Sequence, residues 1–269
     1  MKRFASMLAF VSAVLVSFSS TVAAASWEDL TGPHTTFLIA QAGPTGEYYI
    51  RRPATLSSNG HPVAVVLVGS NSHPKSYDGL FAELASHGVV VIAHSSSDQG
   101  DGTKANAALD WLLEQNEVSS SEYFHKLVTS RILAIGHSAG GNGAVLASIQ
   151  NPRITSVLLY APALSLATPT ELRVPSFFIA GALDGAVPPA DVKTRFEQAS
   201  KAPAWFGVSE KQGHTGFVTN NAVQYYTRAW VYTQLFDGAG SARRCFYGPE
   251  WTRKDAPGWK ETLKSSAAR

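Results

Sequence analysis

The chain has 269 residues, of which 45% are hydrophobic and 16% are charged, a composition that excludes intrinsic disorder and indicates a globular protein with a sizeable core. It carries 22 Lys and Arg residues against 20 Asp and Glu, which gives a formal net charge of +2 at pH 7. This near balance argues against nucleic acid or an anionic membrane as a partner. Nothing in the composition indicates an oligomeric state.

The first 25 residues predict a secretory signal peptide. Lys2 and Arg3 give it a basic start, residues 7–18 form an apolar run, and the alanines at 23–25 form a small-residue cleavage site. The apolar run is too short for a transmembrane helix, and no later segment of the sequence resembles one. We therefore expect a protein secreted to the periplasm or the extracellular space, with residues 26–269 as its mature chain.

The sequence contains a single cysteine, Cys245, which is followed by Phe246 and Tyr247. One cysteine excludes an intramolecular disulfide, even in the oxidising surroundings that a signal peptide implies. Its apolar neighbours indicate that Cys245 packs in the interior and does not act as a nucleophile.

The remaining chain predicts an alternation of strands and helices. Short strands at 35–39 and 47–51, joined by a Gly-Pro turn at 43–46, predict a hairpin of two edge strands. Further strands are expected at 63–68, 89–93, 132–135, 154–160, 176–180 and 204–208, and helices at 77–86, 103–115, 189–199 and 222–236, with another directly after residue 138. This alternation predicts one α/β domain, in which helices cover both faces of a mostly parallel sheet. The residues after Gly238 are expected to pack on its surface.

Residues 131–147 read RILAIGHSAGGNGAVLA and hold the motif G-H-S-A-G at 136–140, between a predicted strand and a predicted helix. In that setting G-x-S-x-G is typical of a nucleophile elbow, a sharp turn that exposes a serine hydroxyl at the end of a strand. The flanking glycines leave room for the strained turn. Ser138 is therefore the candidate nucleophile.

A serine nucleophile needs a histidine that takes its proton and a carboxylate that orients the histidine. In folds with this elbow, the chain order is Ser, then Asp or Glu, then His, each on a loop after a strand. His214 is the one histidine after Ser138, and it lies in a glycine-flanked loop. Asp184 follows a predicted strand and is preferred to Asp191, which belongs to a helix, and to Glu171, which precedes the strand.

The same chemistry needs two backbone N–H groups that stabilise the oxyanion of a tetrahedral intermediate. One is expected from Ala139, because it begins the helix after the serine and the helix dipole favours negative charge there. The other is expected from the loop after the strand at 63–68, with Ser70 as the candidate and Asn71 as its alternative.

The other histidines receive different interpretations. His137 is expected to point away from the nucleophile as a packed, hydrogen-bonded residue, whereas His73 and His94 follow strands and are placed to line a cleft. The sequence has no metal-binding spacing and no nucleotide-binding motif, so neither a metal nor a cofactor is predicted. The loops after Tyr160 and at 98–102 are expected to wall an open cleft without a large lid.

Three stretches, LASHGVVVI at 84–92, GHSAGG at 136–141 and Gly213-His214, resemble the secreted α/β-hydrolases of the dienelactone-hydrolase-like group. That group includes bacterial cutinases, poly(ethylene terephthalate) hydrolases and related lipases and esterases. The resemblance covers about residues 35–247 and implies the α/β-hydrolase fold. It also implies one set of site residues, namely the triad Ser138, Asp184 and His214 and the oxyanion donors Ser70 and Ala139.

The sequence departs from the polyester-degrading members of this group at substrate-contacting positions. Their aromatic residue at the first oxyanion position is Ser70 here, and their methionine after the nucleophile is Ala139. Their ring-clamping tryptophan has no counterpart after the strand that ends at Tyr160, and their carboxy-terminal disulfide is impossible with one cysteine. These differences leave ester hydrolysis intact and weigh against an aromatic polyester as substrate.

Three functions stay open at this point. The first is a secreted serine carboxylic-ester hydrolase that acts on a small-molecule or polymeric ester through an acyl-enzyme. The second is cleavage of an amide or peptide by the same triad, which the motifs do not distinguish from the first. The third is a noncatalytic α/β-hydrolase that binds a ligand or a protein, although such a module has no need of all three triad residues.

Overall fold

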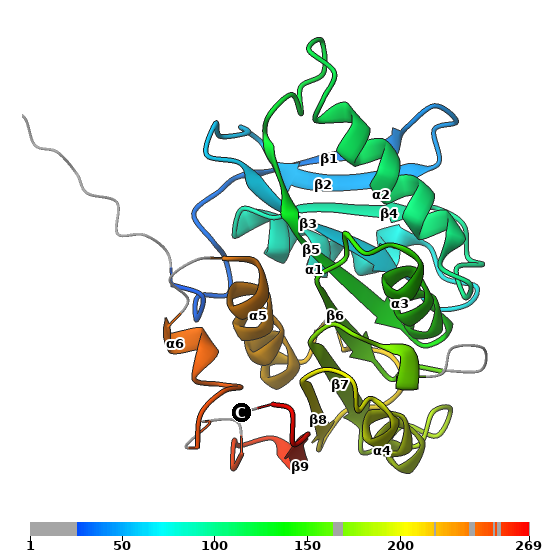
Figure 1. Cartoon of the computed structure of the whole chain (residues 1–269), viewed down its shortest axis with the longest axis vertical. Helices are drawn as coiled ribbons and strands as arrows, with labels where there is room; N and C mark the ends of the chain where they lie inside the picture. The colour runs from blue at the N-terminus through cyan, green and yellow to red at the C-terminus, as the bar shows by residue number, and fades with distance from the viewer. Residues whose placement is uncertain are drawn as a thin grey trace, which may run out of the picture.

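A nine-stranded sheet runs through the described part of the molecule in the order β1-β2-β4-β3-β5-β6-β7-β8-β9 (Figure 1). The computed structural model describes residues 26–163, 169–217, 219–236, 240–249, 251 and 254–268. The signal peptide predicted at residues 1–25 lies outside these described residues. No helix in the described ranges has the length and apolar character needed to cross a membrane.

Strands and helices alternate along the chain. The strands are β1 (Thr36–Ala42), β2 (Tyr48–Pro53), β3 (His61–Leu67), β4 (Val90–His94), β5 (Leu127–His137), β6 (Ser156–Tyr160), β7 (Ser176–Gly181), β8 (Ala204–Ser209) and β9 (Trp259–Lys264). The helices are α1 (Asp78–Ser86), α2 (Thr103–Gln115), α3 (Ala139–Gln150), α4 (Pro189–Gln198), α5 (Asn221–Leu235) and α6 (Gly240–Arg243), with 3-10 turns η1 (Pro74–Tyr77) and η2 (Pro169–Glu171). The six strands from β4 to β8 in the sheet order are parallel, which confirms the predicted mostly parallel α/β architecture.

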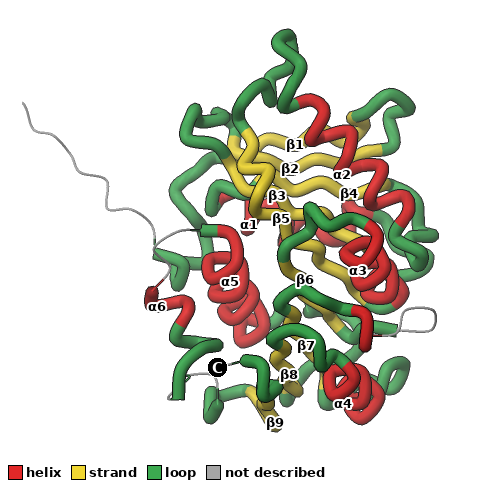
Figure 2. Tube along the Cα trace, viewed as in Figure 1, coloured by secondary structure: helices red, strands yellow, loops and turns green. Residues whose placement is uncertain are grey.

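The parallel strands are buried because both of their faces carry mostly apolar side chains. Every residue of β3, β4, β6, β7 and β8 is buried. Helices α1 and α5 cover one face of the sheet, and α2, α3 and α4 cover the other (Figures 1 and 2). A buried ion pair between Arg228 Nη1 and Glu83 Oε1, 2.6 Å apart, joins α5 to α1. The carboxyl ends of the parallel strands therefore project from a rigid layered frame.

The amino-terminal hairpin forms as predicted, but one of its strands is not at the edge. β1 pairs with β2 in antiparallel fashion, and β2 pairs in turn with β4, so β1 alone borders solvent at this end of the sheet. The prediction of two edge strands is wrong for β2. β2 lies between β1 and β4, and five of its six residues are buried.

The carboxy-terminal segment does not simply pack on the surface of the domain. Trp259–Lys264 form β9, which pairs antiparallel with β8 and closes the other end of the sheet. Cys245 is buried, as its apolar neighbours predict, and the main chain beside it is anchored because Trp205 Nε1 donates to the Phe246 carbonyl at 2.8 Å. The segment after Gly238 thus completes the core around β8.

Helix α3 lies unusually close to the loop that precedes α2. A Cβ atom added at Gly143 would lie 1.9 Å from the Gln99 carbonyl oxygen, a separation that atoms cannot occupy. Gly143 is therefore required by this contact, and the contact fixes the axis of the helix that begins directly after Ser138.

Replacement of Gly143 by alanine should lower the free energy of unfolding by about 3 kcal/mol, because the new methyl group forces α3 away from the 98–102 loop. Gly79→Ala in α1 is the matched control: its Cβ would meet no atom within 4 Å, so it should stabilise the protein by about 0.5–1 kcal/mol. Chemical denaturation of both variants measures these values. Equal effects at the two positions would contradict the close approach of α3.

Candidate active site

Ser138 occupies the turn between β5 and α3 with φ of 54° and ψ of −123°, a backbone conformation that residues other than glycine rarely adopt. The turn is tight: a Cβ at Gly136 would lie 2.4 Å from the Gly140 carbonyl oxygen, and a Cβ at Gly140 would lie 2.2 Å from that of Leu67. The Ser138 N–H donates to the Tyr160 carbonyl at 3.0 Å. Packing and hydrogen bonding together hold the serine in the strained geometry expected of a nucleophile elbow.

The structure brings together the three predicted triad residues. Ser138 Oγ lies 2.9 Å from His214 Nε2, and His214 Nδ1 lies 2.9 Å from Asp184 Oδ2. They come from the loops after β5, β7 and β8, which belong to the run of parallel strands β5-β6-β7-β8 and end at the same carboxyl edge of the sheet. Three residues that are separated by 46 and 30 positions in the sequence thus form one continuous chain of hydrogen bonds.

Asp184 is held as an acceptor. Its side chain is fully buried, and its Oδ1 accepts hydrogen bonds from the N–H groups of Ala186 and Val187 at 2.8 Å each. Its Oδ2 is left to accept from His214 Nδ1, which places the imidazole proton on Nδ1. Nε2 of His214 then has a lone pair that faces the Ser138 hydroxyl and can take its proton. The two rival carboxylates lie elsewhere, Asp191 in α4 and Glu171 in η2.

The two candidate oxyanion donors flank the serine. Ala139 is the first residue of α3, and Ser70 lies in the loop after β3. This loop approaches the nucleophile, since a Cβ at Gly69 would lie 3.4 Å from Ser138 Cβ. Within the described ranges, neither the Ala139 N–H nor the Ser70 N–H has a protein acceptor. Both groups are therefore available to a bound oxyanion.

His137 is buried and hydrogen-bonded at both ring nitrogens, as predicted. Its Nδ1 lies 2.6 Å from Tyr77 Oη, and its Nε2 lies 2.8 Å from the carbonyl oxygen of His214. Burial lowers the pKa of His137 from 6.5 to about 4. No motif marks Tyr77 as a functional residue, because it belongs to the 3-10 turn before α1.

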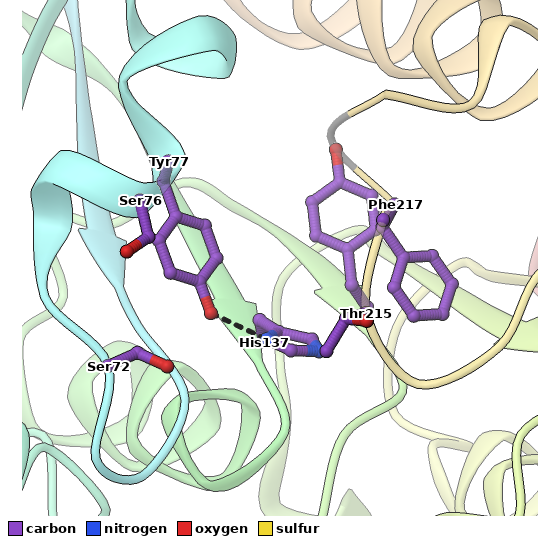
Figure 3. A pocket seen from close by; sticks show the side chains of 8 residues that line it. Ser72, Ser76, Tyr77, His137, Thr215 and Phe217 are labelled. Carbon is purple, nitrogen blue, oxygen red and sulfur yellow. Dashed lines mark hydrogen bonds between the residues drawn. The ribbon is translucent and has the colours of Figure 1, made fainter.

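A cavity of about 150 Å³ opens beside the candidate triad, between Tyr77 and Phe217 (Figure 3). Its lining is mostly aromatic and hydroxyl-bearing: Ser72, Ser76, Tyr77, His137, Tyr160, Thr215, Gly216 and Phe217. This cavity is not lined by the 98–102 loop, His73 or His94, which the sequence pattern places at the cleft. The loop packs against α3, and each of the two histidines accepts a local backbone hydrogen bond. Residues 164–168 of the loop after Tyr160 lie outside the described residues.

Among the residues that the structure describes, no cluster of three or more His, Cys, Asp or Glu side chains is arranged to hold a metal ion. The side chains and backbone at this site offer a candidate nucleophile, a candidate base, an orienting carboxylate and two N–H donors.

The buried imidazole of His137 predicts a loss of stability in acid. Between pH 6.5 and pH 4 the unfolded chain binds a proton at this histidine and the folded chain does not, so the free energy of unfolding falls as the pH is lowered. The loss reaches about 3 kcal/mol near pH 4, at about 1.4 kcal/mol per pKa unit, and vanishes above pH 7.

His137→Gln removes this titrating group. Urea denaturation of both proteins at pH 7, 5.5 and 4.5 should show a shallower dependence on pH for the variant. Parallel dependences would show that His137 is protonated in the folded protein as readily as in the unfolded chain.

Comparison with known proteins gives a consistent picture. Residues 18–238 match the sequence model of a family described as PET hydrolase-like. Cutinase est1 of Thermobifida alba is 27% identical over 182 residues, which cover 65% of this chain and 60% of that protein. Cutinase 2 of Thermobifida cellulosilytica is 26% identical over 65% of this chain and 68% of its own length, and cutinase cut1 of Thermobifida fusca is 26% identical over 65% and 56%. The chain thus matches about 60% of the length of these relatives.

Proposed function

Because the chain belongs to the PET hydrolase-like family, we propose that it is a serine carboxylic-ester hydrolase with Ser138, His214 and Asp184 as its catalytic triad. One observation carries the proposal, namely the unbroken hydrogen-bond line from Ser138 Oγ through His214 to Asp184 at the end of an elbow strand. A module that only binds a ligand has no need of this line. The α/β-hydrolase fold of the family agrees with the mostly parallel sheet.

The reaction proceeds through an acyl-enzyme. His214 Nε2 takes the proton of Ser138 Oγ while the oxygen attacks the ester carbonyl carbon, and Asp184 stabilises the resulting imidazolium. The negative charge on the former carbonyl oxygen is held by the N–H groups of Ala139 and Ser70. The tetrahedral intermediate collapses as His214 gives its proton to the leaving alcohol. Water then attacks the acyl-enzyme by the same steps and releases the acid.

The substrate in this proposal is an ester whose acyl or alcohol group is small. The relatives are named cutinases, and the cavity lined by His137 and Thr215, the sequence neighbours of Ser138 and His214, is small. The position after Pro162 is Ala163, which carries no ring to stack on an aromatic substrate. We extend the proposal to secretion, with residues 1–25 as the signal peptide and 26–269 as the mature hydrolase domain.

Hydrolysis of p-nitrophenyl esters from acetate to laurate by residues 26–269 tests the proposal. Ser138→Ala should lower kcat by about 10⁴-fold or more, since the residual rate over water then comes from the oxyanion donors and binding alone. Asp184→Asn should cost about 10⁴-fold in kcat, because Nδ1 of His214 loses its acceptor and the imidazole adopts the wrong tautomer.

Asp191→Asn is the matched control for Asp184→Asn, since it makes the same chemical change at an exposed residue of α4, and it should leave kcat unchanged. The optimum acyl length separates a short-chain esterase from a lipase-like enzyme. Full activity in Ser138→Ala would refute the serine mechanism. A folded wild-type protein that cleaves anilides but no ester would assign the triad to amide hydrolysis.

A further inference from the structure

Tyr77 has no part in the proposed reaction, yet its hydroxyl group lies where three loops of the site meet. Tyr77 Oη accepts a hydrogen bond from the Gly69 N–H at 3.2 Å and contacts His137 Nδ1 at 2.6 Å (Figure 3). His137 Nε2 in turn contacts the His214 carbonyl oxygen at 2.8 Å. Tyr77 and His137 are both buried.

The direction of each hydrogen bond follows from the partners. The His214 carbonyl can only accept, so Nε2 of His137 carries the proton. Nδ1 of the neutral ring must then accept, and Tyr77 donates its hydroxyl proton to it. This leaves a lone pair of Tyr77 Oη for the Gly69 N–H. The low pKa of His137 keeps the ring neutral above about pH 4. The same hydrogen-bond directions therefore hold at neutral pH.

Each end of this network adjoins a group of the proposed machinery. Gly69 directly precedes Ser70, the first oxyanion donor, and His137 directly precedes Ser138. The carbonyl that His137 holds belongs to His214 itself. A displacement at Tyr77 therefore reaches the base and the oxyanion donor together.

The loop that carries His214 has need of such an anchor. The His214 side chain is 25% exposed, and the Gln212 side chain donates to the carbonyls of Gly213 and Thr215 within the same loop. Those bonds stiffen the loop without attaching it to the nucleophile. In the described part of the chain, the His137 bond is the one that joins the main chain of His214 to β5.

We propose that Tyr77 and His137 are positioning residues, which fix the general base and the first oxyanion donor relative to Ser138. The proposal rests on the proposed function for the roles of those groups. Neither side chain touches the reacting atoms in it. Their effect is on geometry that is used in the transition state, and it is therefore expected in kcat rather than in KM.

The chain offers a matched control for the tyrosine–imidazole pair. Tyr232 Oη lies 3.0 Å from His87 Nδ1, and His87 Nε2 lies 3.0 Å from the Asp29 carbonyl, which repeats the same tyrosine–histidine–carbonyl order. His87 precedes β4, whereas His137 ends β5. One network therefore lies at the amino ends of the parallel strands and the other at their carboxyl ends.

The first test is steady-state kinetics on a p-nitrophenyl ester. Tyr77→Phe keeps the ring and removes the hydroxyl group, and it should lower kcat about 10-fold with KM changed less than about 2-fold. His137→Leu should lower kcat by about 100-fold, and His137→Gln, whose amide can still donate to the His214 carbonyl, should recover part of that loss. The double variant Tyr77→Phe/His137→Leu should be no slower than His137→Leu, because both changes break one network.

Tyr232→Phe should leave kcat and KM unchanged while it lowers the thermal midpoint as much as Tyr77→Phe does. This pair separates positioning from general stability. If Tyr77→Phe and Tyr232→Phe have the same kcat, or if the two effects in the double variant multiply, the proposal is overturned.

A second measurement does not depend on turnover. In Ser138→Ala protein with ¹⁵N-labelled histidine, NMR should show His137 with bare Nδ1 and protonated Nε2 at pH 5–8. Adding Tyr77→Phe should shift the His214 backbone amide signal. A protonated Nδ1, or an unmoved His214 signal, would overturn the proposal even in a protein that hydrolyses no ester. If the protein hydrolyses no ester but shows both the His137 protonation pattern and the shifted His214 signal, the proposed function is refuted while the hydrogen-bond network is supported.

Discussion

The backbone of Ser138, held at φ of 54° and ψ of −123°, is the constraint on which the rest of the site depends. A conformation of this kind costs about 1–3 kcal/mol and persists only where its surroundings enforce it. Here the Ser138 N–H is bound by Tyr160 and its carbonyl accepts from Gly141 and Ala163. β6 and its following loop thus hold the turn from one side, while β3 passes close on the other. The result is a hydroxyl raised above the edge of the sheet, within reach of His214.

Much of this arrangement is predictable from local patterns. Apolar β-branched runs mark the buried strands, because a strand covered by helices on both faces has no polar side to show. The elbow is marked by glycines that the tight turn requires. His214 is the sole histidine after the serine, and Asp184 follows a strand on the same edge, so chain order alone brings them to one place. The loops that follow parallel strands all lie at the same edge of the sheet, so residues far apart in the sequence come close together there.

What the sequence does not predict depends on pairs that no local pattern links. Tyr77 and His137 are 60 residues apart and His137 and His214 are 77 apart, and a tyrosine in a 3-10 turn carries no sign of either partner. β9 is not predicted by local patterns for a related reason. Its sequence WKETLK is half charged, and it forms a strand because β8 offers it an unpaired edge. The cavity walls are hard to predict for the same reason, because segments 72–77 and 215–217 meet the ends of β5 and β6 only through tertiary packing.

The strand β9 has a consequence for how the molecules behave toward one another. Without it, β8 would present the backbone of the apolar segment AWFGVS to solvent, and an open apolar edge is a template for the addition of strands from other chains. β9 replaces that edge with one that carries Lys260, Glu261 and Lys264. Charged side chains, lysine above all, discourage edge-to-edge growth of sheets. β9 therefore ends the sheet with a charged strand edge, which disfavours the addition of a strand from another molecule.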